Sequence, residues 1–522
     1  MGLFVPASID PRWRGKKQKS VIFGIPAPTG GLNARDSFTG MKPEDAISLK
    51  NVFPEANNCV VRNGYAAWST GMTDPVRSLL TWNGLTGADK LFSAAGTSIW
   101  NSTASGAASA DVTGLSNVDF QWTNIKTPGG IFLIAVNAAD GVRSYNGAAW
   151  ADQTASITGT GGAVQTFANV CQFKERLWFS VKDSLDLYYL GLQSIAGAAT
   201  LFPLGSVFRR GGYVIGLGSF SNDAGEGPDD FFVIASSNGE VVVYQGTDPS
   251  STSTWSLVGR FDVGMPIGRR CTIRLNGDLG IITQDGVISM QAALRFDRAS
   301  IQKAAITGKI QTLFSQYSQL YKTNFGWSPC VFPKTRYMIV NVPQVTNTSQ
   351  TQLVMNTLTG QWCQFTNINA GCWGVANDLL YFGGNNGVTY EADNGFRDNG
   401  GNINWEVMTS WQEFGGESTK FYTMCRPTLL VGSGVSYELI VNTDFIVTEP
   451  NGGLGPISAG VPTMMWPFTW PFTWGGKNIL DSRWQSCGAT GTWASIHMNG
   501  IVTDGSCSIN NFDMILERGG PL

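Results

Sequence analysis

The chain has 522 residues, of which 43% are apolar, enough for roughly three or four domains with sizeable cores. Only 14% are charged, against about 25% in typical soluble domains. The net charge of -3 argues against a general nucleic-acid binder, because neutralising phosphates requires clustered Lys and Arg. A surface that depends on Ser, Thr, Asn and Gln is better suited to a component of a larger particle than to a free enzyme.

Residues 1–30 are rich in Pro, Lys and Gly, a composition that cannot bury much apolar surface. We therefore expect an extended arm, and we assign residues 1–65 to this arm and a docking segment. A basic cluster in the arm is either a solvated, flexible stretch or a set of candidate contacts to a neighbouring protein: Arg12, Arg14, Lys16, Lys17 and Lys19.

A short helix is predicted after the arm. Pro43 stands at a first-turn position, and Glu44 and Asp45 follow it, which suits the positive end of a helix that ends near Asn51. The next segment, Val60 to Tyr65, reads as half of a hairpin that leads into a series of repeats.

The repeats are hairpins between Leu91 and Tyr390. Each has an apolar, β-branched or aromatic run, a turn and a second such run, as in 231–235, Asn238-Gly239 and 241–244. Seven turn centres span 291 residues in six steps of about 48, close to one propeller blade: Gly96, Gly141, Asp183, Gly239, Gly286, Asn347 and Gly387. We predict an all-β fold with a β-propeller of about six or seven blades over residues 66–400.

One helix interrupts the propeller, at about 309–322. Its apolar residues recur at i, i+3, i+4, i+7, i+10 and i+11: Ile310, Leu313, Phe314, Tyr317, Leu320 and Tyr321. We expect this helix to pack on the outside of the ring or to plug its channel, with a mobile gating element as the alternative.

The blade period stops after the Gly/Asn/Asp-rich stretch 393–402. Two strand-rich parts, 405–447 and 484–516, predict a C-terminal β-sandwich over residues 401–522. Between them lies an aromatic loop, 466–474, in which proline rules out a central strand. Its rings either fold back onto the protein or form a candidate contact with a protein or a membrane surface: Trp466, Phe468, Trp470, Phe472 and Trp474.

Catalytic and metal-binding motifs are missing. The single histidine, His497, lies in a segment where apolar and polar residues alternate, as in a strand, and the sequence has no GxSxG motif for a catalytic serine. We therefore interpret His497 as a strand residue without a catalytic role. Acidic residues occur among Gly and Asn, as turns do, and not in the order of a calcium loop: Asp223, Glu226, Asp229, Asp230, Asp393 and Asp398. We predict no catalytic residue, no cofactor and no metal site, and hence no enzyme.

The nine cysteines are irregularly spaced and never arranged as CxxC, which indicates neither a zinc site nor a disulfide framework. We expect reduced thiols in the core and assembly in a reducing cytoplasm. The apolar stretch of residues 1–5 is too short for a signal peptide, and no run of 18 apolar residues occurs, so no spanning helix is expected.

Several motifs together resemble those of virion structural proteins from short-tailed bacteriophages. They cover nearly the whole chain: Gly30 to Asp36, Met41 to Ala46, Asn51 to Pro54, Arg62 to Tyr65, Asn238 to Pro249, Pro266 to Arg270 and Glu517 to Leu522. The resemblance implies a tail tubular or nozzle protein, which forms a six-fold ring below the head-tail adaptor and encloses the DNA exit channel. It further implies location in the virion tail after assembly in the host cytoplasm, homo-oligomerisation, contacts with the adaptor and other tail proteins, and transient passage of double-stranded DNA. It provides no catalytic residues.

A ring of this kind can close through heterologous contacts that cover the edges of every subunit. A basic channel wall would bind DNA phosphates, so we predict a neutral or acidic wall with Lys16, Lys17 and Lys19 away from it. Two alternatives remain open. One is a tail propeller that binds host glycans, as a receptor-binding or hub protein, through rings such as Trp466 and Trp470. The other is a carbohydrate hydrolase with paired carboxylates around the central channel.

Overall fold

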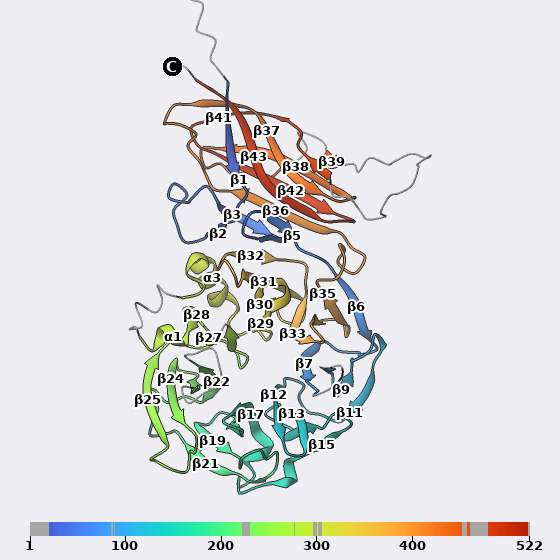
Figure 1. Ribbon diagram of the computed structural model, residues 1–522, viewed down its shortest axis with the longest axis vertical. Coiled ribbons are helices and arrows are strands. Elements are labelled where there is room, and N and C mark those ends of the chain that lie inside the picture. The colour runs from blue at the N-terminus through green and yellow to red at the C-terminus, as the bar shows by residue number, and fades with distance from the viewer. Residues whose placement is uncertain are drawn as a thin grey trace, which may run out of the picture.

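The computed structural model describes residues 20–84, 87, 89–221, 230–275, 277–295, 300, 305–450, 457–459 and 479–519. The prediction of an all-β fold is confirmed: the chain forms a propeller-like ring of small sheets, with a body of two larger sheets attached to one side (Figure 1). Two sets of predicted site residues lie outside the described residues: Arg12, Arg14, Lys16, Lys17 and Lys19 in the arm, and Trp466, Phe468, Trp470, Phe472 and Trp474 in the aromatic loop.

Four sheets, each of four antiparallel strands, begin the ring. They are β7 (Val76–Trp82), β8 (Lys90–Ala95), β9 (Ser98–Asn101) and β11 (Ser109–Val112); β12 (Gln121–Thr127), β13 (Gly130–Val136), β14 (Val142–Tyr145) and β15 (Trp150–Asp152); β17 (Phe167–Phe173), β18 (Arg176–Val181), β19 (Asp186–Tyr189) and β21 (Thr200–Pro203); and β22 (Val214–Ser221), β23 (Asp230–Ser236), β24 (Glu240–Gly246) and β25 (Trp255–Asp262). In Figure 1 the first strand of each sheet lies toward the centre of the ring and the last toward its rim.

The second half of the ring has a three-stranded sheet and two longer groups. They are β26 (Thr272–Leu275), β27 (Asp278–Thr283) and β28 (Gly286–Ser289); β29 (Ser328–Phe332), β30 (Tyr337–Val345), β31 (Ser349–Asn356) and β32 (Trp362–Phe365); and β33 (Ala370–Ala376), β34 (Leu379–Gly384) and β35 (Thr389–Ala392). The last group is completed by β6 (Tyr65–Thr70), which precedes the whole ring in sequence and pairs antiparallel with β35. Backbone hydrogen bonds thus join the start of the ring to its end.

All seven predicted turns are hairpin loops. Each joins two adjacent antiparallel strands of one sheet, from β8 and β9 to β34 and β35. Gly239, between β23 and β24, shows why glycine is needed: its φ is +84°, and an added Cβ would lie 2.7 Å from the carbonyl carbon of Gly264. The hairpin signal therefore located the middle strands of the sheets correctly.

The predicted helix is α3 (Gln311–Tyr321), which packs against β30 and β28. Ile310 and Phe314 are fully buried, whereas Leu320 is 67% exposed and does not join the apolar face. The other helical segments with bounds in the described part of the chain are short: α1 (Met290–Ala293) and the 3-10 turns Thr154–Ser156, Ala163–Thr166, Gly308–Ile310 and Pro333–Thr335.

The attached body consists of two sheets packed face to face, with one core that continues into the ring. One sheet contains β3 (Asp45–Lys50), β36 (Ile403–Thr409), β42 (Ala494–Val502) and β38 (Val435–Thr443), with β2 (Gly31–Leu32) and β39 (Ile457–Ala459) at its margins. This sheet continues into the ring, because β3 also pairs with β32 at Lys50 and Gln364 and so joins β29–β32. The other contains β1 (Val21–Pro26), β43 (Cys507–Arg518), β37 (Lys420–Val431), β41 (Gln485–Gly491), β40 (Ile479–Asp481), β4 (Val52–Pro54) and β5 (Cys59–Val61).

The last part of the predicted N-terminal arm is not an arm. Residues 21–26 form β1, which pairs with β43 at the other end of the chain, and the two lie side by side in Figure 1. Ile25 and Ala27 are 3% and 1% exposed. The prediction of an extended arm over residues 1–30 is therefore wrong from about residue 21 onward, because the apolar run finds its partner strand almost 500 residues away.

The helix predicted before Asn51 is also wrong. Residues 45–50 form β3, which pairs with β36 and buries Ala46 and Leu49 completely. The Asp45 carboxylate does not cap a helix; it accepts a hydrogen bond from Asn33 Nδ2 at 2.8 Å. Pairing within the sheet outweighs the local helix signal of Pro43 and the acids after it.

Candidate functional sites

A buried ion pair joins the two-sheet body to the ring. Arg62, between β5 and β6, donates to both carboxylate oxygens of Asp398 at 2.8 and 2.7 Å, and the two side chains are 1% and 7% exposed. The remaining guanidinium donors are also satisfied, by Asn51 Oδ1 at 2.8 Å and by the carbonyls of Thr366 and Asn63 at 3.0 Å each. A buried charge pair is stable only when its remaining polar groups are satisfied, as they are here.

Asn51 completes this arrangement, which we call the junction network (Asn51, Arg62, Thr366, Asp398 and Asn404). Its amide donates to Thr366 Oγ1 at 2.9 Å and to the Asn404 carbonyl at 2.7 Å. The network links the ends of β3, β32 and β36 with the segments on either side of the ring closure. Nearby, Gly64 is required, because an added Cβ would lie 1.9 Å from the Arg397 carbonyl oxygen.

A second polar tie centres on Lys309, which precedes α3. Its ammonium group donates to Asp45 Oδ1 at 2.6 Å, to Gln361 Oε1 at 3.1 Å and to the Gly30 carbonyl. Gly30 cannot carry a side chain here, since an added Cβ would lie 2.5 Å from Asp45 Oδ1. The motif segments around residues 30, 45, 51 and 62 therefore all lie where the body meets the ring.

The structure gives the predicted acidic residues separate roles. Asp230 pairs with Lys174 at 2.6 Å, and Asp393 accepts from Asn63 Nδ2 at 2.8 Å. Asp398 belongs to the junction network, a role that its Gly- and Asn-rich surroundings did not indicate. Asp223, Glu226 and Asp229 lie outside the described residues. Within the described ranges, no group of three or more His, Cys, Asp or Glu side chains could hold a metal ion.

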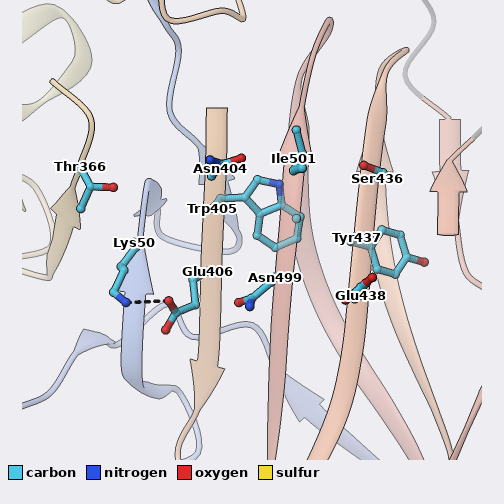
Figure 2. Close-up of a pocket in the computed structure, with 11 residues that line it drawn as sticks. Lys50, Thr366, Asn404, Trp405, Glu406, Ser436, Tyr437, Glu438, Asn499 and Ile501 are labelled. Carbon is cyan, nitrogen blue, oxygen red and sulfur yellow. Dashed lines mark hydrogen bonds and ion pairs between the residues drawn. The ribbon is translucent and has the colours of Figure 1, made fainter. Parts of the chain in front are cut away.

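A row of polar side chains crosses four adjacent strands of the body (Figure 2). Lys50, Glu406, Asn499 and Glu438 come from β3, β36, β42 and β38, and each is in register with the next. They line a shallow groove of about 510 Å³, and Lys50 Nζ lies 2.7 Å from Glu406 Oε2. No local pattern predicted this row, since its members are far apart in the chain.

His497 lies beside this row and is 1% exposed. It is a strand residue of β42, as predicted, and its Nδ1 lies 2.9 Å from the Thr448 carbonyl. Its Nε2 lies 3.6 Å from Glu406 Oε1 and 3.8 Å from Glu449 Oε2. These distances are too long for a good hydrogen bond but short enough for attraction between opposite charges.

The charges around His497 shift two pKa values. Burial lowers the pKa of His497, but Glu406, the Thr448 carbonyl and Glu449 outweigh burial and raise it above 6.5. Burial raises the pKa of Glu406, but its interactions with His497, Lys50 and Ser48 outweigh that effect and lower the pKa to about 2. Glu406 is therefore ionised at neutral pH and cannot act as a general acid.

A second hollow lies at the axis of the ring, and we call it the axial pocket. It is an open hollow with a volume of about 380 Å³, and it is lined by the innermost strands β12, β17, β22 and β26. The described residues of its lining are mostly polar and include two arginines but no carboxylate: Gln121, Trp122, Thr123, Asn169, Val170, Cys171, Gln172, Leu217, Gly218, Ser219, Arg269, Thr272, Ile273, Arg274 and Leu279. The sequence marked Arg269 only as part of a motif and did not assign it to a site.

Arg270, next to the axial pocket, ties the two sides of the ring together. Its Nη2 donates to Ser78 Oγ at 2.6 Å and to the Phe120 carbonyl at 3.3 Å, both in or beside the first two sheets. The ring of Phe325 lies 3.8 Å from the Arg77 guanidinium carbon and 5.5 Å from that of Arg270. These cation–π contacts fix the side chains at the axis.

The thiols resemble core residues and not catalytic ones. All nine cysteines are free, six are buried and three are half-buried. Burial raises the pKa of Cys171 to about 11 and that of Cys271 to about 12. A thiol with such a pKa is protonated at neutral pH, whereas a nucleophilic cysteine reacts as the thiolate.

The groove contains two carboxylates, Glu406 and Glu438, on strands that are separated by β42, and Glu406 cannot donate a proton because its pKa is lowered to about 2. None of the described residues that line the axial pocket is a carboxylate. Asp111 and Asp393 are described carboxyl groups whose pKa is raised, in both cases by burial. Neither lines the groove or the axial pocket. In the part of the chain that the structure covers, no helix has the length and apolarity to cross a membrane.

Comparisons with known proteins give no family. The chain matches no protein-family model and no curated protein. Among solved structures it is similar to a computationally designed protein, with 10% identity, a TM-score of 0.36 and coverage of 66% of this chain and 96% of that chain. It is also similar to an exo-beta-1,3-galactanase from Phanerochaete chrysosporium, with 10% identity, a TM-score of 0.29 and coverage of 75% of this chain and 95% of that chain. Similarity to Raptor from Chaetomium thermophilum has 10% identity, a TM-score of 0.40 and coverage of 64% of this chain and 29% of that chain. Similarity at these levels says nothing about function.

Proposed function

We propose that this chain is a structural subunit of a short-tailed bacteriophage tail, and that its copies form a nozzle ring below the head-tail adaptor around the DNA exit channel. The observation that carries the proposal is the position of the motifs that resemble such proteins. Gly30, Asp45, Asn51 and Arg62 all make contacts that fasten the body to the ring, with Lys309, Thr366 and Asp398 as their partners. Motif residues with architectural roles are expected of a structural protein.

We infer that the ring is a propeller of seven blades. Six blades are the sheets that begin with β7, β12, β17, β22, β26 and β29, and the seventh combines β33, β34 and β35 with β6. Closure by β6 leaves the ring without an open end between its first and last blades, which suits a subunit that must keep its shape during assembly.

A free strand edge offers a contact to a neighbouring copy. Among the described strands, β1 pairs only with β43, and Val21 and Ile22 are 37% and 61% exposed. An apolar, unpaired edge is a liability in a monomer, and a closed ring of subunits can cover it. The candidate arm contacts, Arg12 to Lys19, precede this strand directly in the sequence.

We propose that the subunit has no catalytic role. A carbohydrate hydrolase needs a proton-donating carboxyl near a second carboxylate. The groove has Glu406 and Glu438, but Glu406 stays ionised and their two strands are separated by β42, and none of the described residues that line the axial pocket is a carboxylate. The glycan-binding alternative depends on Trp466 and Trp470, outside the described residues. The predicted neutral or acidic wall concerns the channel between subunits and remains a prediction; the arginines described above lie at the axis of one subunit.

Gene replacement in the phage tests this proposal. Without the chain, we expect DNA-filled heads that lack the lower tail and do not infect, and we expect the wild-type chain supplied in trans to restore the tail. Complete tails in its absence would contradict the proposal. Trp466→Ala particles that assemble normally but fail to adsorb to the host would favour glycan binding.

A further inference from the structure

We propose that the axial pocket binds a small, multiply charged oxyanion, whose phosphate or carboxylate groups are held by Arg269 and Arg274. This inference concerns a site within one subunit, and it does not depend on the role of the chain in a tail. It rests on the charge, the free donors and the rigidity of the pocket.

Among the described residues, no carboxylate pairs with the two arginines of the pocket. Arg269 forms no hydrogen bond or ion pair with any residue that the structure describes, and Arg274 bonds only to the hydroxyl and carbonyl groups of Ser219, which are neutral. Asp119, whose negative charge acts on the neighbouring Arg270, is already held by Arg77 at 2.6 and 3.0 Å. Arg269 is half-buried and Arg274 is exposed, so both guanidinium groups are accessible to a ligand in the pocket that they line. A guanidinium binds a carboxylate or phosphate group with two parallel hydrogen bonds.

Neutral donors lie around the same hollow. Gln121 and Gln172, from β12 and β17, are half-buried, and their amides have no hydrogen-bond partner among the described residues. Together with Arg269 they give the pocket several donors that are free to bind a ligand. The volume of about 380 Å³ matches small-molecule sites and not a DNA duplex.

The segment that carries Arg269 is held on both sides. Ile267, two residues before it, is 1% exposed, and Pro266 forms a bridge with Thr283. Arg270, directly after it, is anchored to Ser78 and Phe120. A donor on a backbone that is fixed in advance loses little freedom on binding, which increases affinity.

Isothermal titration calorimetry of the full chain tests the site with pyrophosphate and with citrate as probes. We expect one site per chain, and the tighter of the two probes shows whether phosphate or carboxylate is preferred. Arg269→Gln should weaken binding by about tenfold or more, because it removes a charged, forked donor. Arg260→Gln is the matched control, since Arg260 is exposed on the rim strand β25 and the change in net charge is the same.

The control variant should bind within about twofold of the wild type, as expected for a distant surface charge. The melting temperature of Arg269→Gln should match that of the wild type, since the Arg269 side chain forms no hydrogen bond or ion pair with a described residue. If Arg269→Gln is destabilised, Arg269→Lys replaces it in the test; it keeps the positive charge and should retain part of the affinity. Three results would each overturn the proposal: neither probe binds at millimolar concentration, Arg269→Gln binds as tightly as the wild type, or Arg260→Gln loses as much affinity as Arg269→Gln.

Discussion

Replacing Arg62 with Ala should strongly destabilise the protein. Arg62 makes five hydrogen bonds at 2.7 to 3.0 Å in a site where its side chain is 1% exposed. Its removal leaves the Asp398 carboxylate, itself 7% exposed, without its cation. Breaking a buried ion pair from one side typically costs about 3 to 5 kcal/mol, and we expect a loss of that size in the free energy of unfolding.

A double variant separates the buried charge from the loss of packing. Arg62→Met together with Asp398→Leu leaves no unpaired charge, so it should be clearly more stable than Arg62→Ala. The control is Arg210→Ala, which breaks a 2.7 Å pair with Asp262 whose side chains are 45% and 42% exposed. An exposed pair contributes less than about 1 kcal/mol.

Urea denaturation followed by tryptophan fluorescence measures these differences, provided that the slope with denaturant is unchanged between variants. The reasoning would be refuted if Arg62→Ala lost no more stability than Arg210→Ala. It would also fail if the double variant were as unstable as Arg62→Ala.

Four further predictions can be checked on the purified protein. Because the pKa of His497 is raised on folding, protonated His497 stabilises the folded protein. This stabilisation is complete below pH 6.5, the ordinary pKa, and it is lost as the pH rises through the higher pKa of the folded state. The stability lost in His497→Gln should therefore shrink as the pH is raised from about 6 to about 8, and a loss that grows would contradict this sign. Gly64→Ala should lower the melting temperature, whereas Gly191→Ala, with no atom within 4 Å of the added Cβ, should not. A thiol reagent should react slowly with the folded protein, because its nine cysteines are buried or half-buried, and it should modify all nine after unfolding. Rapid modification of several thiols in the folded protein would contradict this burial. Deleting residues 2–19 should leave the urea midpoint unchanged, whereas deleting 2–30 removes β1 and should lower it; equal midpoints would mean that β1 is dispensable.

Local signals in the sequence predicted the ring well. Hairpins are specified by residues next to one another, such as Asn238-Gly239 between two apolar runs, so their turns could be placed individually. The helix at 311–321 was found for the same reason, because its apolar spacing lies within one short segment. The strands at 21–26 and 45–50 were missed because their partners, β43 and β36, are hundreds of residues away.

The candidate sites depend even more on distant contacts. Arg62 and Asp398 are 336 residues apart, and neither residue alone indicates a buried pair. Arg269 stands out only when the described residues around the axial pocket are seen to include no carboxylate. The doublet Arg269-Arg270 after Gly268 was the one local signal for the axial pocket, and its two members turn out to have different roles.

Immunogold electron microscopy of purified particles, with an antibody to this chain, is the most direct test of the proposed place in a phage tail. The proposal predicts gold confined to a short tail at one vertex of the particle. Particles without label, or a chain that is found only free in the lysate, would contradict it.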